Sequence, residues 1–234
     1  RLDQIKVSLA DIDALFLTHL HSDHVIDFYQ LIISSWHSYR IKPWIVYGPK
    51  GTKKFVKNIL DAWKDERTQR IQYEARSSTK AFNVIVKEFK SKGNLKIKDL
   101  NITYFEVDHK PVKYAYGFSF KNKNKKLTIS GDTKPCENII KYAQNADVLL
   151  HEVYIDGELQ NTNKMRSKTT LHNVRSYHTP SSLLGKIAKL TKCKKLVLTH
   201  LVPTKFNEKK LKKTISDDYG KDPIIGYDLL KIKI

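Results

Sequence analysis

The sequence has few cysteines and no long hydrophobic run. Its two cysteines, Cys136 and Cys193, lie far apart and in no metal-binding spacing, so we expect both to be free thiols. No apolar run approaches the ~18 residues that a transmembrane helix needs, and we expect no membrane span. Internal repeats and linker-like stretches are also lacking. We therefore predict a single domain over residues 1–234.

Acidic residues are scarce beside basic ones, with 24 Asp and Glu against 43 Lys and Arg, for a net charge of +19. A strong positive charge fits a polyanionic partner such as RNA, because clustered lysines displace counterions from phosphates. It also fits a solvated, lysine-rich surface. The excess is spread over 121–126, 189–195 and 207–214, and this scatter favours the solvated surface.

The composition is otherwise that of a globular protein, with 40% hydrophobic and 10% aromatic residues. The chain opens at Arg1, rather than at a methionine, and runs almost directly into an apolar segment. We take the true N-terminus to be missing or processed. A signal peptide is then neither found nor excluded, and the localisation stays open.

Hydrophobic periodicity predicts strands first and then alternating helices and strands. The predicted strands are 14–18, 43–49, 82–89, 100–109, 114–121, 125–133, 147–154 and 194–201, and the predicted helices are 25–40, 50–70, 136–146 and 179–192. In the last helix we place Thr179 at the N-cap and Pro180 at the first helical position. This order argues for helices stacked outside sheets.

Polar residues of the kind that bind metals follow the apolar strands repeatedly. They are His19, His21, Asp23 and His24, then His109, Asp132, the pair His151 and Glu152, and finally His200. A single histidine at a strand end is usually structural, but strand ends are where open sheets place chemistry. In an extended segment His19 and His21 would point the same way, with Asp23 and His24 in the following turn. Nitrogen and carboxylate ligands without thiolates suit zinc, and also manganese or iron.

These motifs resemble the metallo-β-lactamase superfamily. "THLHSDH" matches its H-x-H-x-D-H signature, and His109, "SGDT" and "LTHL" match its later motifs in order. The resemblance implies an αββα sandwich, whose opening strands would lie before Arg1, and two divalent metal ions. It implies the following ligands: His19, His21 and His109 for the first metal, Asp23, His24 and His200 for the second, and Asp132 bridging both.

Further segments resemble the branch of arylsulfatase-like hydrolases and RNase Z, the tRNA 3′-processing endonuclease. They are "WIVYGPKGT", "LLHEVY", "HTPSSLLGKIA" and "LVLTHLVP". The resemblance implies that His178 is a proton donor and that Glu152 supports it. Asp23 can accept the proton of the nucleophile, and His151 stays outside the metal set. We take 155–177 as a candidate substrate lid.

Three functions remain open. We prefer an arylsulfatase-like hydrolase of small sulfate or phosphate esters, with phosphodiesters or lactones also in range. RNase Z is the alternative, supported by the shared site and the charge. Against it, residues 52–108 hold one glycine and no proline where that enzyme has a glycine- and proline-rich tRNA-binding arm, and its "S-R-Y" after the final histidine is missing. A non-catalytic nucleic-acid binding module ranks last, because all seven ligand residues are present. By resemblance, a homodimer also stays open.

Overall fold

The computed structural model describes residues 1–158 and 167–234. They form two compact units, residues 1–90 and residues 91–234. Each unit has its own sheet and its own core, and each is described by itself. No helix in the described residues is both long enough and apolar enough to cross a membrane.

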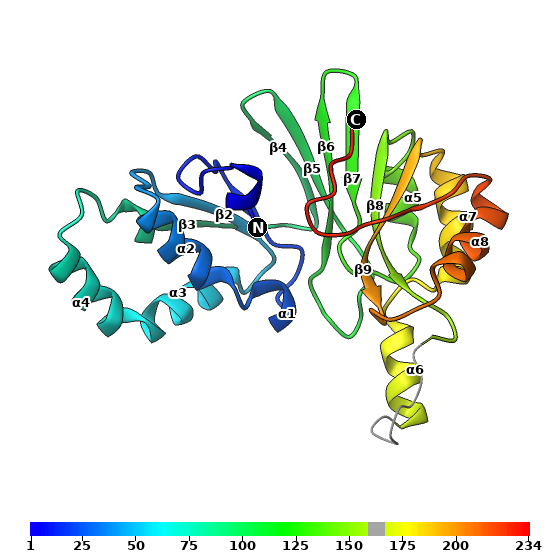
Figure 1. Ribbon diagram of the computed structural model, residues 1–234, viewed down its shortest axis with the longest axis horizontal. Helices are drawn as coiled ribbons and strands as arrows, with labels where there is room; N and C mark the ends of the chain where they lie inside the picture. Colours follow the sequence, from blue (N-terminus) through cyan, green and yellow to red (C-terminus); the bar gives the residue numbers. More distant parts are fainter. Residues whose placement is uncertain (159–166) are drawn as a thin grey trace. The chain divides into compact units, whose positions relative to one another are not determined.

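The first unit is built on a three-stranded parallel sheet in the order β1-β2-β3 (Figure 1). The strands are β1 (Leu15–Phe16), β2 (Trp44–Gly48) and β3 (Val84–Glu88), and the helical segments are η1 (Asp3–Ile5), α1 (Ser22–Val25), α2 (Phe28–His37), α3 (Thr52–Ala62), α4 (Lys64–Glu74) and η2 (Lys80–Phe82). Alternate residues of β2 are buried, as expected of a strand that packs one face against helices. Trp44 and Val46 on that face contact Phe28 and Ile32 of α2 and Val56 of α3.

A buried arginine holds the segment that leads into β1. The Arg40 guanidinium lies 4.0 Å from the ring centroid of Trp44. It donates hydrogen bonds to five carbonyl oxygens, those of Leu9, Ala10, Ile12, Lys42 and Pro43. A buried charge needs such partners, because an unpaired one is strongly destabilising. Arg40 thereby fixes the entry to the strand that precedes the histidine cluster.

The second unit is built on a seven-stranded mixed sheet in the order β10-β9-β8-β7-β6-β5-β4 (Figure 1). The strands are β4 (Lys92–Ile97), β5 (Leu100–Glu106), β6 (Tyr116–Asn122), β7 (Lys125–Ile129), β8 (Val148–Tyr154), β9 (Lys195–Val202) and β10 (Ile224–Ile225). The helices are α5 (Glu137–Tyr142), α6 (Lys168–Ser176), α7 (Ser181–Thr191) and α8 (Glu208–Tyr219). Neighbours from β4 to β7 are antiparallel, and neighbours from β7 to β10 are parallel.

The core of this unit lies between the sheet and helices α7 and α8. Leu149 of β8 and Leu196 of β9 face Leu184 of α7, and all three are fully buried. α7 packs closely on α8 at Gly185, where a Cβ atom would collide with the carbonyl oxygen of Ile215. The absence of a side chain at Gly185 therefore allows the two helices to approach each other and cover the sheet.

Two predicted helices differ from the structure. The helix expected at 50–70 is two helices, α3 and α4, because Trp63 leaves the helical conformation and stacks on Tyr29 with ring centroids 5.1 Å apart. The helix expected at 25–40 begins only at Phe28, after the separate turn α1. In both cases the hydrophobic periodicity of the sequence continues across the point where the helix is interrupted, so the periodicity does not show the interruption.

The start of α7 and the strand β4 are further corrections. We placed Thr179 at the N-cap and Pro180 in the first turn, but the helix begins at Ser181 with Pro180 as the N-cap residue. Thr179 instead directs its backbone N–H to Glu152 and its hydroxyl to the carbonyl oxygen of Thr133. β4 was not predicted, because "KGNLKI" has a single β-branched residue, Ile97, and no aromatic residue.

Candidate metal centre

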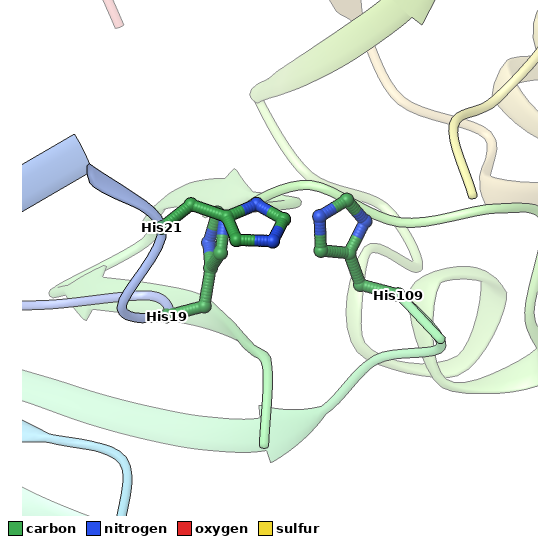
Figure 2. A group of neighbouring side chains, drawn as sticks. All are labelled: His19, His21 and His109. Atoms are coloured by element: carbon green, nitrogen blue, oxygen red, sulfur yellow. The ribbon is translucent and has the colours of Figure 1, made fainter. Parts of the chain in front are cut away.

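The first unit gathers three histidines directly after β1. The ring centroid of His19 lies 4.7 Å from that of His21 and 4.2 Å from that of His24. The segment is extended up to His21, so His19 and His21 lie on the same side, as alternation predicts. Figure 2 shows these two side chains, together with His109 of the second unit. Thr18 Oγ1 lies 3.0 Å from His19 Nδ1 and helps to orient that ring.

Asp23 and His24 lie in the turn that follows, within α1. His24 Nε2 is 3.5 Å from Asp23 Oδ2. The predicted turn is therefore a short helix that carries one carboxylate and one imidazole beside the His19 and His21 rings. The four residues offer nitrogen and oxygen donors within a stretch of six positions.

In the second unit one carboxylate lies near two histidines. Asp132 Oδ2 is 3.4 Å from His200 Nε2 and 4.0 Å from His109 Nε2. Asp132 follows β7 and His109 follows β5, two strands that run in the same direction. Because such strands end at the same edge of a sheet, their following residues meet there. The strand-end pattern in the sequence thus predicts this grouping.

His109 is oriented through its other ring nitrogen. His109 Nδ1 is 2.8 Å from the carbonyl oxygen of Tyr177, so we assign the ring proton to Nδ1 and the lone pair to Nε2. Metal-binding histidines are commonly held in this manner by a backbone carbonyl or a carboxylate. The Tyr177 contact could not be predicted from the sequence, because a backbone carbonyl is present at every residue.

His200 sits on a β-bulge rather than at the end of its strand, where we predicted it. β9 continues to Val202, and its pairing shifts so that Glu152 faces Thr199 while Val153 faces Leu201. The extra residue, His200, has φ of 44°, in the left-handed region. That conformation is unfavourable for a residue with a side chain, and bulges often redirect side chains beside active sites. Here the bulge directs His200 towards Asp132.

Glu152 and His178 form a buried pair. His178 Nδ1 is 3.2 Å from Glu152 Oε2, and both side chains are almost wholly inaccessible. The other carboxylate oxygen, Oε1, accepts hydrogen bonds from the backbone N–H groups of Thr179 (2.7 Å) and Thr133 (3.3 Å). Burial raises the pKa of Glu152 well above its usual value. The carboxyl group is thus fixed in position while it faces His178.

The imidazole of His178 lies next to Asp132 and His200. One ligand atom from each of the three residues falls within 4.8 Å of the others, and the rings of His178 and His200 stack with centroids 5.4 Å apart. Since Nδ1 faces Glu152, Nε2 is the nitrogen that can act on a molecule bound beside Asp132 and His200.

His151 and Glu152 lie within β8, which agrees with the strand predicted over 147–154. His151 is completely buried, and its Nδ1 lies 2.7 Å from the carbonyl oxygen of Glu152. Its Nε2 has no hydrogen-bond partner among the described residues. Burial lowers the pKa of His151 to about 4, so its imidazole is neutral near pH 7. None of the potential ligand groups among the described residues includes His151.

The donor chemistry of both units fits a divalent metal. Each unit offers imidazole nitrogens and a carboxylate, and none of these donors is a thiolate. Such sets suit zinc and also manganese or iron. Within the second unit, His109 Nε2 and His200 Nε2 both lie within 4.0 Å of one Asp132 oxygen. Three donor atoms that could bind a metal therefore lie close together.

The connector at 155–177 lies only partly within the described residues. Residues 159–166 lie outside them, and residues 168–176 form α6. Arg175 on this helix pairs with Asp156 at 3.0 Å, and Asp156 also accepts hydrogen bonds from Ser182 at the start of α7. A lid role for the connector stays a prediction.

Solved structures define the class of this protein. The metallo-β-lactamase fold protein YhfI from Bacillus subtilis matches with a TM-score of 0.69 at 19% identity, covering 96% of this chain and 79% of that one. Human tRNase Z, short form, matches with a TM-score of 0.68 at 19% identity, covering 100% and 83%. The chain thus has the metallo-β-lactamase fold, and the predicted αββα class is confirmed.

Sequence relatives define the family more narrowly. Ribonuclease Z of Mycolicibacterium gilvum is 30% identical over 207 residues, covering 87% of this chain and 71% of that protein. Ribonuclease Z of Mycobacterium bovis is 26% identical over 239 residues, covering 100% and 84%. A family model described as anti-Pycsar protein Apyc1 matches residues 1–188. The chain belongs to the anti-Pycsar protein Apyc1 family and is related to ribonuclease Z.

These relatives bear on the choice among hydrolases. They support a metal-dependent hydrolase, the coarser part of our functional prediction. Because they are ribonucleases Z, they favour the alternative that we ranked second over the arylsulfatase-like interpretation that we preferred. Sequence motifs shared by the whole branch could not separate the two.

Proposed function

We propose that this protein is a metal-dependent phosphodiesterase that hydrolyses RNA in the manner of ribonuclease Z. The observation that carries the proposal is the buried pair of His178 and Glu152 beside Asp132 and His200, in a chain whose relatives include ribonucleases Z. The pair would provide a proton donor beside Asp132 and His200.

The proposed ligand set comprises seven residues, as the superfamily resemblance implies: His19, His21, Asp23, His24, His109, Asp132 and His200. Its basis is the superfamily signature and the donor groupings described within each unit. We propose two ions, with zinc as the expected metal. Once bound, two such ions would lower the pKa of a water molecule and stabilise negative charge on the phosphoryl oxygens.

The residues of the chain would then bind, orient and move protons. Asp23, on the exposed turn of α1, is proposed to accept the proton of the attacking water. His178 would give a proton from Nε2 to the departing oxygen, a step typically worth about 10²–10⁴-fold in rate. Glu152 would hold Nδ1 of His178, so that Nε2 is the nitrogen directed to that transfer.

The raised pKa of Glu152 is compatible with this role. The pair can hold its shared proton on Glu152 Oε2 or on His178 Nδ1. If the carboxyl group is protonated, it donates to Nδ1 and the neutral imidazole carries its proton on Nε2. If the carboxylate is ionised, the imidazolium carries a proton on both nitrogens. In either arrangement Nε2–H is available as the donor.

A small phosphodiester is the second candidate substrate, and one observation favours it. Residues 52–108 contain one glycine and no proline, and α3, α4 and strands β3 to β5 lie within this range. A glycine- and proline-rich tRNA-binding arm is therefore not evident there. A homodimer and a small sulfate ester substrate stay predictions, without support from the relatives described above.

Parallel assays on zinc-loaded protein separate these candidates. The substrates are a precursor tRNA, bis-p-nitrophenyl phosphate and p-nitrophenyl sulfate. Cleavage of the tRNA precursor at its 3′ side supports the proposal. Hydrolysis of the phosphodiester alone favours the small substrate. Hydrolysis of the sulfate alone overturns the phosphodiesterase assignment and restores the arylsulfatase-like interpretation.

A further inference from the structure

Two of the three lysine runs that looked scattered in the sequence, 121–126 and 189–195, reach the same end of the second unit's sheet. The β4–β5 and β6–β7 hairpins project from that end (Figure 1). The run at 189–195 reaches the same end, because Lys194 donates its backbone N–H to Ala146 and its Nζ lies 2.8 Å from Asp147 Oδ1. Asp147 Oδ2 in turn accepts the backbone N–H of Lys126 at 2.8 Å.

We call this region the lysine end, defined by Lys96, Lys98, Lys121, Lys123, Lys125, Lys126, Lys194 and Lys195. The segments that carry these lysines, 96–101, 121–126 and 194–195, hold one carboxylate, Asp99, and the adjoining segment 146–147 adds Asp147. Most of the lysines are exposed. The charge at this end is therefore strongly positive, although the runs are far apart in the chain.

The strand register aligns part of this charge into a row. Lys96 of β4 lies opposite Asn101, Asn101 lies opposite Lys121, and Lys121 lies opposite Lys126 of β7. Side chains directly opposite each other share one face of a sheet, and neighbouring strands are about 4.8 Å apart. Three lysines and an asparagine thus span four strands on one face, over roughly 14 Å.

This row is costly to the fold. Like charges directly opposite each other destabilise a strand pair, and Lys121 and Lys126 form such a pair. The next row on the same face is also polar, with Asn94, Thr103, Ser119 and Thr128 aligned across the same strands. Asn94 and Thr103 of this second row are accessible, whereas Ser119 and Thr128 are buried. The lysines, Asn94 and Thr103 therefore offer the polar contacts that phosphate and sugar oxygens need.

We propose that the lysine end binds the phosphate backbone of RNA, as a docking surface remote from the reaction centre. This inference rests on the proposed function. Lys126 is six residues before Asp132 along β7 and the loop after it, roughly 20 Å at the rise of a strand. An RNA strand rises about 3.4 Å per nucleotide, so one of about six nucleotides or more can reach both places. Smaller phosphodiesters cannot.

The test variant replaces three exposed lysines of this end, Lys96→Gln, Lys121→Gln and Lys125→Gln. Lys126 is kept, because its Nζ donates to the carbonyl oxygen of Gln144 and supports the fold. The matched control removes the same charge from α7 and α8 through Lys186→Gln, Lys209→Gln and Lys213→Gln, three lysines that are also exposed. Both sets are made in the zinc-loaded His178→Ala protein, so that RNA is not consumed.

Binding is measured by fluorescence anisotropy with a labelled RNA of about 20 nucleotides, over salt from about 50 to about 200 mM. We expect the lysine-end variant to bind at least about 10-fold more weakly, with a salt slope reduced by about 2, since each lost contact to single-stranded RNA removes about 0.7 from it. The control should change affinity less than about twofold. Equal losses of RNA affinity in both variants would overturn the proposal, since they would show that RNA responds only to the net charge of the protein.

The same substitutions are also made in protein that retains His178, and hydrolysis by these variants is measured. This measurement separates the inference from the proposed function. Hydrolysis of bis-p-nitrophenyl phosphate should be unchanged, and KM for a long RNA should rise. Loss of RNA binding at the lysine end in a protein that hydrolyses no RNA would contradict the proposed function while supporting the docking surface. Unchanged RNA affinity would contradict the docking surface, whatever RNA the enzyme cleaves.

Discussion

Glu152 Oε2 lies 3.2 Å from His178 Nδ1, in a pair that is buried and anchored by two backbone N–H groups. Glu152 belongs to β8, and His178 lies between α6 and α7. The hydrogen bonds from Thr133 and Thr179 hold one carboxylate oxygen, Oε1, in place, and the other oxygen, Oε2, faces the imidazole. The orientation of His178 is therefore determined by strand β8 as well as by its own segment.

Replacing Glu152 by Gln should reduce activity towards substrates with poor leaving groups by about 10-fold to 100-fold. The amide can still accept hydrogen bonds from Thr133 and Thr179, but it no longer stabilises protonated His178. The basic limb of the pH–rate profile should move to lower pH, because the protonated imidazole loses its charged partner. Glu208→Gln on the exposed start of α8 is the control. An unshifted profile would contradict the positioning role.

Asp132→Asn should lower the metal content from two ions per chain to one or fewer. An amide oxygen carries no charge, and Asp132 Oδ2 faces both His109 and His200. The measurement is elemental analysis by mass spectrometry after gel filtration. His172→Ala, at an exposed position, should keep the full content. Two tightly bound ions in the Asn variant would show that Asp132 is not a bridging ligand.

The bulge at His200 predicts a difference between two substitutions that both remove a ligand. His200→Gly and His200→Ala should lose metal equally. In the metal-free state, His200→Gly should be more stable than His200→Ala by about 1 kcal/mol, because glycine adopts φ of 44° without strain. Urea unfolding of both metal-free variants measures this difference. A more stable Ala variant would argue against strain at this residue.

Burial of His151 predicts a specific sensitivity to acid. Its folded-state pKa of about 4 lies below the ordinary value of 6.5. Between these two pH values His151 is therefore protonated in the unfolded chain and neutral in the native state. The corresponding stability is present above pH 6.5 and is lost as the pH falls towards 4. Between pH 6.5 and about 5 the loss is roughly 2 kcal/mol.

His151→Leu should remove most of that loss, even if it lowers stability at neutral pH through the missing hydrogen bond to the Glu152 carbonyl oxygen. The test compares unfolding free energies of metal-free protein at the two pH values, with His172→Leu as the exposed control. An unchanged pH dependence in His151→Leu would show that His151 is protonated in the native state.

The residues of the candidate site could be predicted from the sequence more completely than the bounds of the helices and strands that carry them. Asp132 and His109 could be placed together, because strands running in one direction end at the same edge of a sheet. The pairing of Glu152 with His178 was expected from family resemblance, and the structure brings the two side chains into contact. Their roles stay predictions until they are measured.

Other features could not be predicted, for physical reasons. A non-glycine residue at positive φ, such as His200, leaves no mark in a single sequence, and neither does the backbone carbonyl that orients His109. Trp63 interrupts a helix whose apolar period continues.

The most direct test of the account compares native protein and His178→Ala, at equal metal content, on two phosphodiesters. Bis-p-nitrophenyl phosphate releases a phenolate that needs no proton near pH 7, whereas an RNA dinucleotide releases an alkoxide that does. We predict a loss of less than about 10-fold on the first and about 10²–10⁴-fold on the second. Equal losses on both substrates, or full activity on the dinucleotide, would contradict the assignment of His178 as the proton donor of a phosphodiesterase.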